Sequence, residues 1–505
     1  MTSTEDMTTT ATLDQAVEST ADHTPTGAAK AAAMRDALAY VERWVAFQGE
    51  LLGTPGIQVA VRHKGELLLD LAWGVADVET QAPLTTDHLF RIASHSKTFT
   101  ATAALQLVEA GELRLDDTVE QWVPALAGSG VATVTVRELL GHQGGVIRDG
   151  SDANYWQRGG GVFPDRDAII AMAKAEGVVY ATNEHFKYSN IGYSLLGLVL
   201  EGASGMSYAE LVAERITGPL GTTAMGPEWL AERDGEFAAG HTGRTRAGEA
   251  RHRIRHVDTA AMAPATGWFA TAADLTVYGS AHAFGNETLV TDASKRLLQR
   301  PESPVTHAGV TRHYGLGFDV ETIGSRAVVG HSGGYPGHIT RTWIDPKDDL
   351  VVSALTNAID GPAGTIAGGV LAIIDLALAL AEEVEADASV AVPASIAAEL
   401  EGRFANLWSV EDVVSLGGRL VILAPKAPEP AGFVVRLRVT DTADSLATDD
   451  VAGFWATGEP AVFGRDADGA VETLTTSGMT SWRIDAWRAA LESGDLAGAL
   501  PRVSL

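Results

Sequence analysis

The stretch FRIASHSKTFTATAALQLVEAG, residues 90–111, brings two serines and a lysine close together. Ser94 and Lys97 are three residues apart, so on a helix their side chains share one face and lie within reach of each other. A serine hydroxyl attacks well only when a neighbouring base removes its proton. Lysine can be that base when burial lowers its pKa, and the apolar residues around this pair favour burial.

The second serine of the stretch is a weaker candidate. Ser96 is adjacent to Lys97 in sequence, and on a helix its side chain would point about 100° away around the axis. Ser94 is therefore the predicted nucleophile and Lys97 its base. A serine three residues before a lysine is also a common coincidence, so this prediction depends on the other motifs of the chain.

Tyr188 and Asn190 lie at the start of an apolar helical segment, KYSNIGYSLLGLVLE. The phenol of a tyrosine can relay a proton, and the amide of an asparagine can donate a hydrogen bond to a substrate. The same pair also fits an ordinary helix N-cap with a packed aromatic ring. The segment alone leaves both interpretations open.

His331, Gly333 and Gly334 follow a strand-like run in VVGHSGGYPGH. Glycines at this place let a substrate approach the edge of a strand closely. The backbone N–H of Gly334 could then help to stabilise an oxyanion. A hairpin turn with a surface histidine would have the same composition, so this motif too has a purely structural interpretation.

The elements that must position these motifs alternate along the chain. Apolar and polar residues alternate on both sides of Lys64-Gly65, which predicts a β-hairpin. A helix over residues 90–111 and a Gly-rich region of helices and loops from about 135 to 300 come next. Strand patterns return at 313–322, 325–334, 338–346 and 349–357, before an apolar helix over 366–381. This order predicts an α+β fold, in which an antiparallel sheet from both chain ends is flanked by helices and carries an all-helical subdomain.

Composition divides the chain into four parts. Residues 1–30 have the composition of a disordered tail, residues 31–385 form the α+β domain, and residues 386–394 are acidic and Ala-rich like a linker. Short alternating segments spaced by Gly and Asp fill residues 395–505. This pattern predicts a small all-β, barrel-like domain.

Charge and composition exclude several classes of function. The chain of 505 residues has a net charge of −28 and no cysteine. We therefore expect no nucleic-acid partner, no binding to anionic membranes, and no disulfide or cysteine nucleophile. The apolar run 366–381 is short for a membrane span and carries Asp375, which favours a buried helix. The N-terminus lacks the basic and apolar regions of a signal peptide, so a cytoplasmic location is expected.

The three motifs together, SxxK, YxN and HxG, resemble the motif set of penicillin-recognising serine enzymes. Segments such as LFRIASHSKTFTATAALQLVEAGELRLDDTVEQWVP, KYSNIGYSLLGLVLE and YGLGFDV are similar to the class C β-lactamase-like branch, and they occur in that family's order over residues 41–382. This branch includes carboxylesterases, D-aminopeptidases and D,D-peptidases. The resemblance implies the β-lactamase/transpeptidase-like fold, and the C-terminal part resembles the lipocalin-like barrels attached to several of these hydrolases.

The resemblance implies a role for each motif. Ser94 would be the nucleophile that forms an acyl-enzyme, and Lys97 and Tyr188 would share its proton and return it to the leaving group. Asn190, together with Lys97, would orient the substrate around its carbonyl. Neither a metal nor a cofactor is implied.

The late strand supplies the rest of the implied site. The backbone N–H groups of Ser94 and Gly334 would stabilise the oxyanion, while His331 and Gly333 would line the pocket. Lysine usually stands at the place of His331, and histidine carries less positive charge at pH 7, so a substrate carboxylate is a less suitable anchor. This feature is similar to the D-aminopeptidase and some esterase branches. The turn GHQGG, residues 141–145, replaces His-Thr-Ser-Gly and is interpreted as a structural variant.

The expected function is that of a serine hydrolase that cleaves small-molecule ester or amide bonds, including those of short peptides. A D-stereospecific aminopeptidase is the alternative among enzymes, and it would need an acidic or carbonyl cluster for the substrate ammonium group. A non-catalytic, assembly-forming homologue is the alternative of another class. The barrel could send a loop to the site or mediate assembly into a homo-oligomer, and the sequence leaves this choice open.

Overall fold

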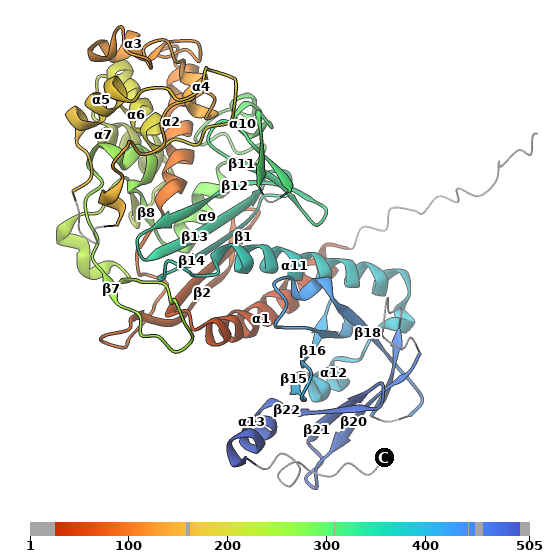
Figure 1. The fold of residues 1–505 in the computed structure, drawn as a ribbon. Coiled ribbons are helices and arrows are strands. Elements are labelled where there is room, and N and C mark those ends of the chain that lie inside the picture. The colour runs from red at the N-terminus through yellow and green to blue at the C-terminus, as the bar shows by residue number, and fades with distance from the viewer. Residues whose placement is uncertain (1–25, 158–161, 308, 443, 450–457, 495–505) are drawn as a thin grey trace, which may run out of the picture.

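A large antiparallel sheet with its helices and a separate closed barrel make up the fold (Figure 1). The computed structural model describes residues 26–157, 162–307, 309–442, 444–449 and 458–494. Most of the tail predicted over residues 1–30 lies outside the described residues. The first helix, α1 (Gly27–Leu52), begins a few residues earlier than the tail's predicted end because the side chain of Thr26 caps it by accepting a hydrogen bond from the backbone N–H of Ala29.

The sheet has nine strands in the order β3-β2-β1-β14-β13-β12-β11-β10-β9. Because β1 pairs with β14, the two ends of the domain meet at the centre of the sheet, as predicted. The predicted hairpin forms at Lys64 and Gly65, where both residues have the positive φ values that a tight two-residue turn requires. The strands are β1 (Gly56–His63), β2 (Glu66–Asp77), β3 (Ala82–Pro83), β9 (Ser303–His307), β10 (Val310–Tyr314), β11 (Asp319–Ile323), β12 (Arg326–Tyr335), β13 (His338–Asp345) and β14 (Leu350–Thr356).

Helices cover both faces of this sheet and form a core on each side. On one face α1 packs side by side with α11 (Ala363–Ala386), and Gly369 makes this close approach feasible because a Cβ there would lie 2.2 Å from the ring of Trp44. Helix α11 is long and apolar enough to cross a membrane by composition, but 56% of that apolar window is buried. Its Asp375 pairs with Arg326 at 2.6 Å, so the prediction of a core helix is confirmed.

The other face carries α9 (Ala272–Ser280) and the helical subdomain, where α2 (Ser96–Glu109) and α6 (Asn190–Ser204) pack together in the larger core. The remaining helices there are α3 (Val119–Trp122), α4 (Val136–Leu140), α5 (Arg166–Ala175), α7 (Tyr208–Val212), α8 (Gly218–Leu220) and α10 (Asp292–Gln299). Short strands accompany them: β4 (Phe90–Arg91), β5 (Met225–Gly226), β6 (Gly240–His241), β7 (Arg253–Ile254) and β8 (Phe269–Ala270). The predicted insertion between the two sets of strands is therefore present, but it is mainly helical rather than all-helical, because it also contains these short strands.

The C-terminal part is a closed barrel whose eight strands run in chain order, β15 to β22. Residues 386–394, predicted as a linker, contain the end of α11, a 3-10 turn and the first residue of α12 (Ala394–Leu400). The strands are β15 (Gly402–Ala405), β16 (Val410–Leu416), β17 (Arg419–Leu423), β18 (Val434–Val439), β19 (Ser445–Asp449), β20 (Pro460–Arg465), β21 (Val471–Thr476) and β22 (Met479–Arg483), followed by α13 (Ile484–Ser493).

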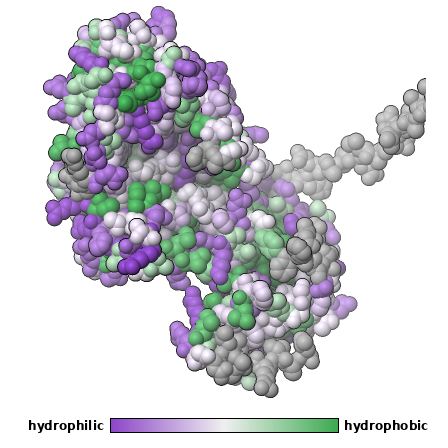
Figure 2. All heavy atoms as spheres, in the orientation of Figure 1, coloured by the Kyte–Doolittle hydropathy of each residue, from purple (hydrophilic) through white to green (hydrophobic). Residues whose placement is uncertain are grey.

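The barrel packs against α1 and α11, on the side of the sheet away from α2 (Figure 1). The side chains of Trp44 and Gln48 both donate hydrogen bonds to the carbonyl oxygen of Pro425, at 3.2 and 2.7 Å. The Tyr40 hydroxyl donates to Asp412 at 3.0 Å. Figure 2 shows two lobes, with hydrophobic and hydrophilic residues intermixed on the face in view.

Candidate active site

Ser94 lies in a 3-10 turn, Ala93–His95, directly before α2 rather than inside an α-helix. The chain arrives from β4, and the Ile92 N–H donates to the Trp268 carbonyl oxygen at 2.9 Å. The next residue, Ala93, has a φ of 48°, in the left-handed region that side chains disfavour. This sharp, strained turn leaves the Ser94 side chain partly exposed while its neighbours are buried.

Ser96 is buried and holds this turn in place. Its hydroxyl donates to the carbonyl oxygen of Ala93 at 2.5 Å and accepts a hydrogen bond from the N–H of Trp268 at 3.0 Å. Both hydrogen-bonding directions of the hydroxyl are therefore occupied by backbone groups. Of the two serines, Ser94 is the one whose side chain faces Lys97, at 3.3 Å.

Lys97 is fully buried, and its amine contacts three oxygen atoms. Nζ lies 3.3 Å from Ser94 Oγ, 2.8 Å from Asn190 Oδ1 and 2.8 Å from the carbonyl oxygen of Ala265. Burial lowers the pKa of Lys97 well below its usual range, although the charge of Asp149 opposes this shift. A neutral amine has two N–H groups for Asn190 and Ala265 and a lone pair for the Ser94 proton, which is the arrangement of a general base.

Tyr188 adds a phenol to this group. Its hydroxyl interacts with the Ser94 side chain, and its ring centroid lies 4.7 Å from Lys97 Nζ. Burial raises the pKa of Tyr188, so the phenol keeps its proton at neutral pH. A neutral phenol beside the nucleophile can donate its proton to the leaving group of a substrate.

His142 lies in the turn GHQGG, residues 141–145, which was predicted to be only a structural variant. The ring of His142 lies 4.4 Å from the ring of Tyr188 and 5.0 Å from that of Tyr193. Its Nδ1 accepts a hydrogen bond from the Ser189 N–H at 3.1 Å, which places its proton on Nε2. Burial lowers the pKa of His142 well below its usual range, so an uncharged ring packs against the ring of Tyr188.

Asn190 begins α6, and its amide is held from two sides. Oδ1 accepts from Lys97, and Nδ2 donates to Asp149 Oδ1 at 2.7 Å. Asp149 also accepts from the indole of Trp156 at 3.2 Å and pairs with Arg148 at 3.0 Å. An amide nitrogen has two N–H groups, so Asn190 retains one for a substrate. Asp149 lies in a loop without a recognisable motif, so its place in the site was not predicted from the sequence.

His331 is buried at the edge of this group. Its Nε2 lies 3.1 Å from the Tyr314 hydroxyl and its Nδ1 lies 2.6 Å from the carbonyl oxygen of Ser332. Burial lowers the pKa of His331 to about 4, although the charge of Asp319 opposes the shift. The imidazole is therefore uncharged at pH 7 and offers no cation to a substrate carboxylate.

Strand β12 presents an open edge beside the Ser94 turn. Its pairing with β11 ends at Gly330, so within the described residues the segment from His331 to Tyr335 pairs only with β13. Gly333 packs directly against the Ser94 turn: a Cβ at this position would come within 2.1 Å of the Ile92 carbonyl oxygen. A Cβ on Gly334 would have no neighbour nearer than 3.6 Å. The strand thus approaches the nucleophile closely and keeps backbone groups free to bind a substrate.

The two glycines give a matched pair of variants. We expect Gly333→Ala to destabilise the protein by about 2 kcal/mol, because the added methyl group must push β12 away from the Ser94 turn. Gly334→Ala should change the free energy of unfolding by less than about 0.5 kcal/mol. Urea denaturation of both variants measures the difference, and equal stabilities would show that β12 does not pack on the turn in this way.

Among the described residues no group of three or more His, Asp or Glu side chains could hold a metal ion. The group consists instead of a hydroxyl, a buried amine, a phenol and an amide, on elements that are far apart in sequence. Such a set performs nucleophilic and acid–base chemistry at a carbonyl group.

The model of the Beta-lactamase family matches residues 41–371, well over half of the chain. The chain therefore belongs to the β-lactamase/transpeptidase-like family, and the resemblance seen in the sequence is confirmed.

Several curated relatives are similar to this chain. A penicillin-binding protein of Bacillus subtilis is 29% identical over 320 residues, which are 60% of this chain and 67% of that protein. A D-aminopeptidase of Brucella anthropi is 28% identical over 62% of this chain and 58% of its own length. An esterase of Burkholderia gladioli is 33% identical over 33% of this chain and 45% of its own length. Hydrolases of both esters and peptides thus occur among the relatives.

One solved structure extends the likeness to nearly the whole chain. The octameric penicillin-binding protein homologue of Pyrococcus abyssi covers 88% of this chain and 99% of its own, with a TM-score of 0.59 and 23% sequence identity. At this level of identity the likeness concerns the fold. It agrees with the large sheet, the helical subdomain and the barrel described above.

Proposed function

We propose that this protein is a serine hydrolase that cleaves small ester or amide bonds through an acyl-enzyme on Ser94. The observation that carries the proposal is the environment of Lys97. This amine is fully buried beside the Ser94 hydroxyl and makes no ion pair with a carboxylate among the described residues. A lysine in such a place is kept neutral and can accept the proton of Ser94.

The reaction follows from these positions. Lys97 takes the proton of Ser94 Oγ as that oxygen attacks the carbonyl carbon of the substrate, while Tyr188 keeps its own proton. The N–H groups of Ser94 and Gly334 stabilise the tetrahedral oxyanion. When the intermediate collapses, Tyr188 donates its proton to the leaving oxygen or nitrogen and receives the proton held by Lys97, so the amine is neutral again and the acyl group stays on Ser94. Water then attacks this ester with the same base, releasing the acid and the free hydroxyl.

The charges around the site favour a substrate without a carboxylate anchor. His331 is neutral at pH 7, and Arg341 is engaged by Asp319 at 2.6 Å. In penicillin-recognising enzymes a lysine usually stands at the place of His331. That lysine provides a positive charge, which the neutral His331 does not. We therefore expect p-nitrophenyl esters of short acids to be hydrolysed and nitrocefin to be a poor substrate.

A D-stereospecific aminopeptidase is the second candidate, and Asp149 is the observation that favours it. An aminopeptidase must bind the ammonium group of its substrate. The carboxylate of Asp149 lies 2.7 Å from Asn190 Nδ2, and only 13% of its side chain is exposed. A cation placed next to Asn190 would therefore meet a partly desolvated carboxylate, where charge pairs are stronger than in water. The relationship to a D-aminopeptidase supports the same candidate.

The variant Asp149→Asn separates the two candidates. If Asp149 binds an ammonium group, KM for D-alanyl p-nitroanilide should rise at least about ten-fold relative to KM for p-nitrophenyl acetate. The ratio of the two KM values is the readout, because a general disturbance of Asn190 would affect both substrates alike. An unchanged ratio would remove Asp149 from substrate recognition.

The proposal as a whole is tested with a panel of p-nitrophenyl esters and of D- and L-alanyl p-nitroanilides. Turnover of esters supports the esterase form of the proposal, and turnover of D-anilides without ester preference supports the aminopeptidase. The absence of both, in a protein with an intact fold, would favour the third candidate, a non-catalytic protein that forms assemblies. We also propose a cytoplasmic, homo-oligomeric enzyme, the second point being supported by the octameric homologue.

A further inference from the structure

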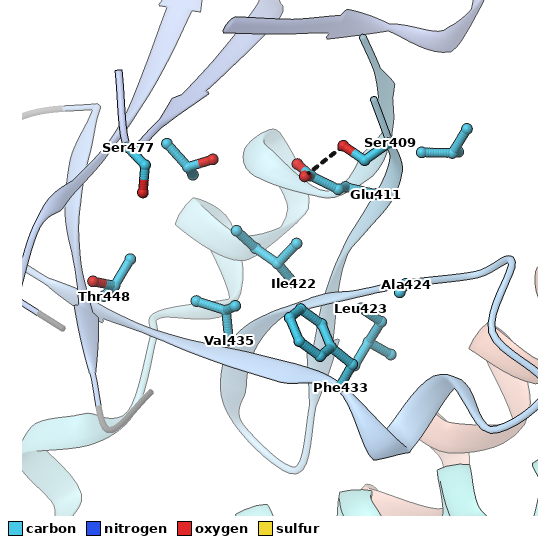
Figure 3. A pocket seen from close by; sticks show the side chains of 11 residues that line it. Ser409, Glu411, Ile422, Leu423, Ala424, Phe433, Val435, Thr448 and Ser477 are labelled. Atoms are coloured by element: carbon cyan, nitrogen blue, oxygen red, sulfur yellow. Dashed lines mark hydrogen bonds between the residues drawn. The ribbon is translucent and has the colours of Figure 1, made fainter. Parts of the chain in front are cut away.

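The C-terminal barrel encloses a cavity of about 170 Å³. Most of its lining is apolar and includes Val410, Ile422, Leu423, Phe433 and Val435 (Figure 3). These residues come from β16, β17 and β18 and from the segment just before β18. Eight-stranded barrels are wide enough to hold one small ligand when their interior is not filled by side chains, and a cavity of about this size accepts a molecule as large as benzene.

One ionisable side chain points into this apolar cavity. Glu411, on β16, is 8% exposed and directs its carboxyl group toward the interior (Figure 3). Its Oε1 accepts a hydrogen bond from the Ser409 hydroxyl at 2.9 Å. Its Oε2 is buried and has no hydrogen-bond partner among the described residues. A buried carboxyl oxygen without a partner is costly, so a ligand that supplies a hydrogen bond there would be stabilised.

The cavity is separate from the Ser94 site. The barrel lies beyond α1 and α11, whereas the Ser94 turn precedes α2 on the other side of the sheet (Figure 1). The residues that line the cavity include the exposed Ser477, in the turn between β21 and β22. Trp408, which is 83% exposed, directly precedes the lining residue Ser409. An exposed indole beside the lining would offer an apolar surface to an approaching ligand.

The chemistry of Glu411 selects among ligands of this size. An amine satisfies the free oxygen in either protonation state, since an ammonium donates to the carboxylate and a neutral amine accepts from the carboxylic acid. Charge-assisted hydrogen bonds are about twice as strong as neutral ones, which favours an amine over an alcohol. A carboxylate ligand would be repelled by Glu411, and the net charge of −28 disfavours anions generally.

We propose that the barrel is a binding site for a small, mostly hydrocarbon primary amine, whose nitrogen bonds to Glu411 and whose hydrocarbon part fills the space between Ile422, Phe433 and Val435. The site does not depend on hydrolysis at Ser94. Burial raises the pKa of Glu411, and the hydrogen bond from Ser409 opposes that shift. An amine would keep the group ionised and so reverse the effect of burial.

Ligand-observed NMR titrations of the full chain at pH 7.5 test this site with n-hexylamine, 1-hexanol and hexanoate. We expect hexylamine to bind at least ten-fold more tightly than either of the others. Glu411→Gln should abolish this preference, because the amide has nearly the same shape as the carboxyl group but no negative charge to pair with an ammonium. The matched variant Glu472→Gln, on β21 and not part of the cavity lining, should retain it.

A second variant distinguishes the barrel from other amine sites on the molecule. Val435→Phe fills part of the cavity and should remove hexylamine binding while circular dichroism shows an intact fold. Hexylamine binding that persists in Val435→Phe would place the amine elsewhere, for example near Asp149, and would overturn the proposal. Equal affinities for hexylamine and hexanol, an unchanged preference in Glu411→Gln, or binding of none of the three ligands would overturn it as well.

Discussion

Replacing Lys97 with methionine is expected to lower kcat/KM for a p-nitrophenyl ester by about 10⁴-fold. Methionine keeps the length and the apolar part of the side chain but removes the amine that lies 3.3 Å from Ser94 Oγ. Without a base, the Ser94 hydroxyl keeps its proton and attacks poorly. Steady-state kinetics of the purified variant measure the loss, and circular dichroism checks that the fold is retained.

A second buried lysine serves as the control. Lys295 on α10 is also fully buried, but its amine pairs with Asp292 at 3.1 Å and donates to the Ala283 carbonyl oxygen at 2.7 Å. Its contacts satisfy a charged ammonium, whereas those of Lys97 suit a neutral amine. Lys295→Met should therefore reduce stability while kcat of the folded protein changes less than about three-fold. Similar losses of kcat in both variants would mean that Lys97 acts only through folding.

The pH dependence of the parent enzyme reports on the same lysine. Burial lowers the pKa of Lys97, and the amine is active only after it loses its proton. The value of kcat/KM should therefore rise with pH along a limb whose midpoint lies below the usual pKa range of lysine. The residual activity of Lys97→Met should lack this limb. Since the pKa of His331 is about 4, His331→Gln should leave the profile between pH 5 and 8 unchanged.

Tyr188→Phe is expected to lower kcat by about 10² to 10³-fold. The phenylalanine ring preserves the packing against His142, at 4.4 Å, and the contact with the Lys97 amine. The variant removes only the hydroxyl that interacts with Ser94 and, in the proposed reaction, passes a proton to the leaving group. The effect should be larger for anilides than for p-nitrophenyl esters, because an amine leaving group needs the proton more than p-nitrophenolate does.

Tyr193→Phe is the matched control for this variant. The Tyr193 ring also lies near the Lys97 amine, at 5.6 Å, but its hydroxyl donates to the Leu140 carbonyl oxygen at 2.7 Å. Its loss should cost about 1 kcal/mol of stability and change kcat less than about three-fold. If both tyrosine variants reduce kcat equally, or if Tyr188→Phe reduces esters and anilides alike, Tyr188 is not the proton relay.

Much of the fold was predictable because hydrophobic periodicity is a local property. The hairpin at Lys64-Gly65, the apolar helix around Asp375 and the strands of the barrel all show it in their own residues. That the side chains of Ser94 and Lys97 face each other was predictable too, because it follows from their separation of three residues. The turn that holds them was not, because the conformation of Ala93 depends on a backbone hydrogen bond between Ile92 and the distant Trp268.

Other parts of the site depend on contacts that no local pattern records. His142 lies in a turn whose glycines look the same whether the histidine is exposed or packed on Tyr188. Asp149 reaches Asn190 from a loop, and only the tertiary fold brings the two together. The barrel cavity was equally hidden, because Glu411 occurs in an alternating strand pattern that does not show on which side the carboxyl group lies.

Labelling with a fluorophosphonate probe tests the central claim most directly, since such probes react with activated serine nucleophiles. We predict that intact-protein mass spectrometry finds one adduct per chain and that peptide mapping places it on Ser94. Ser94→Ala should not be labelled, and Lys97→Met should be labelled far more slowly than the parent. A Ser94→Ala protein that is labelled as fast as the parent, or a folded parent that takes up no label, would contradict the assignment of Ser94 as the nucleophile.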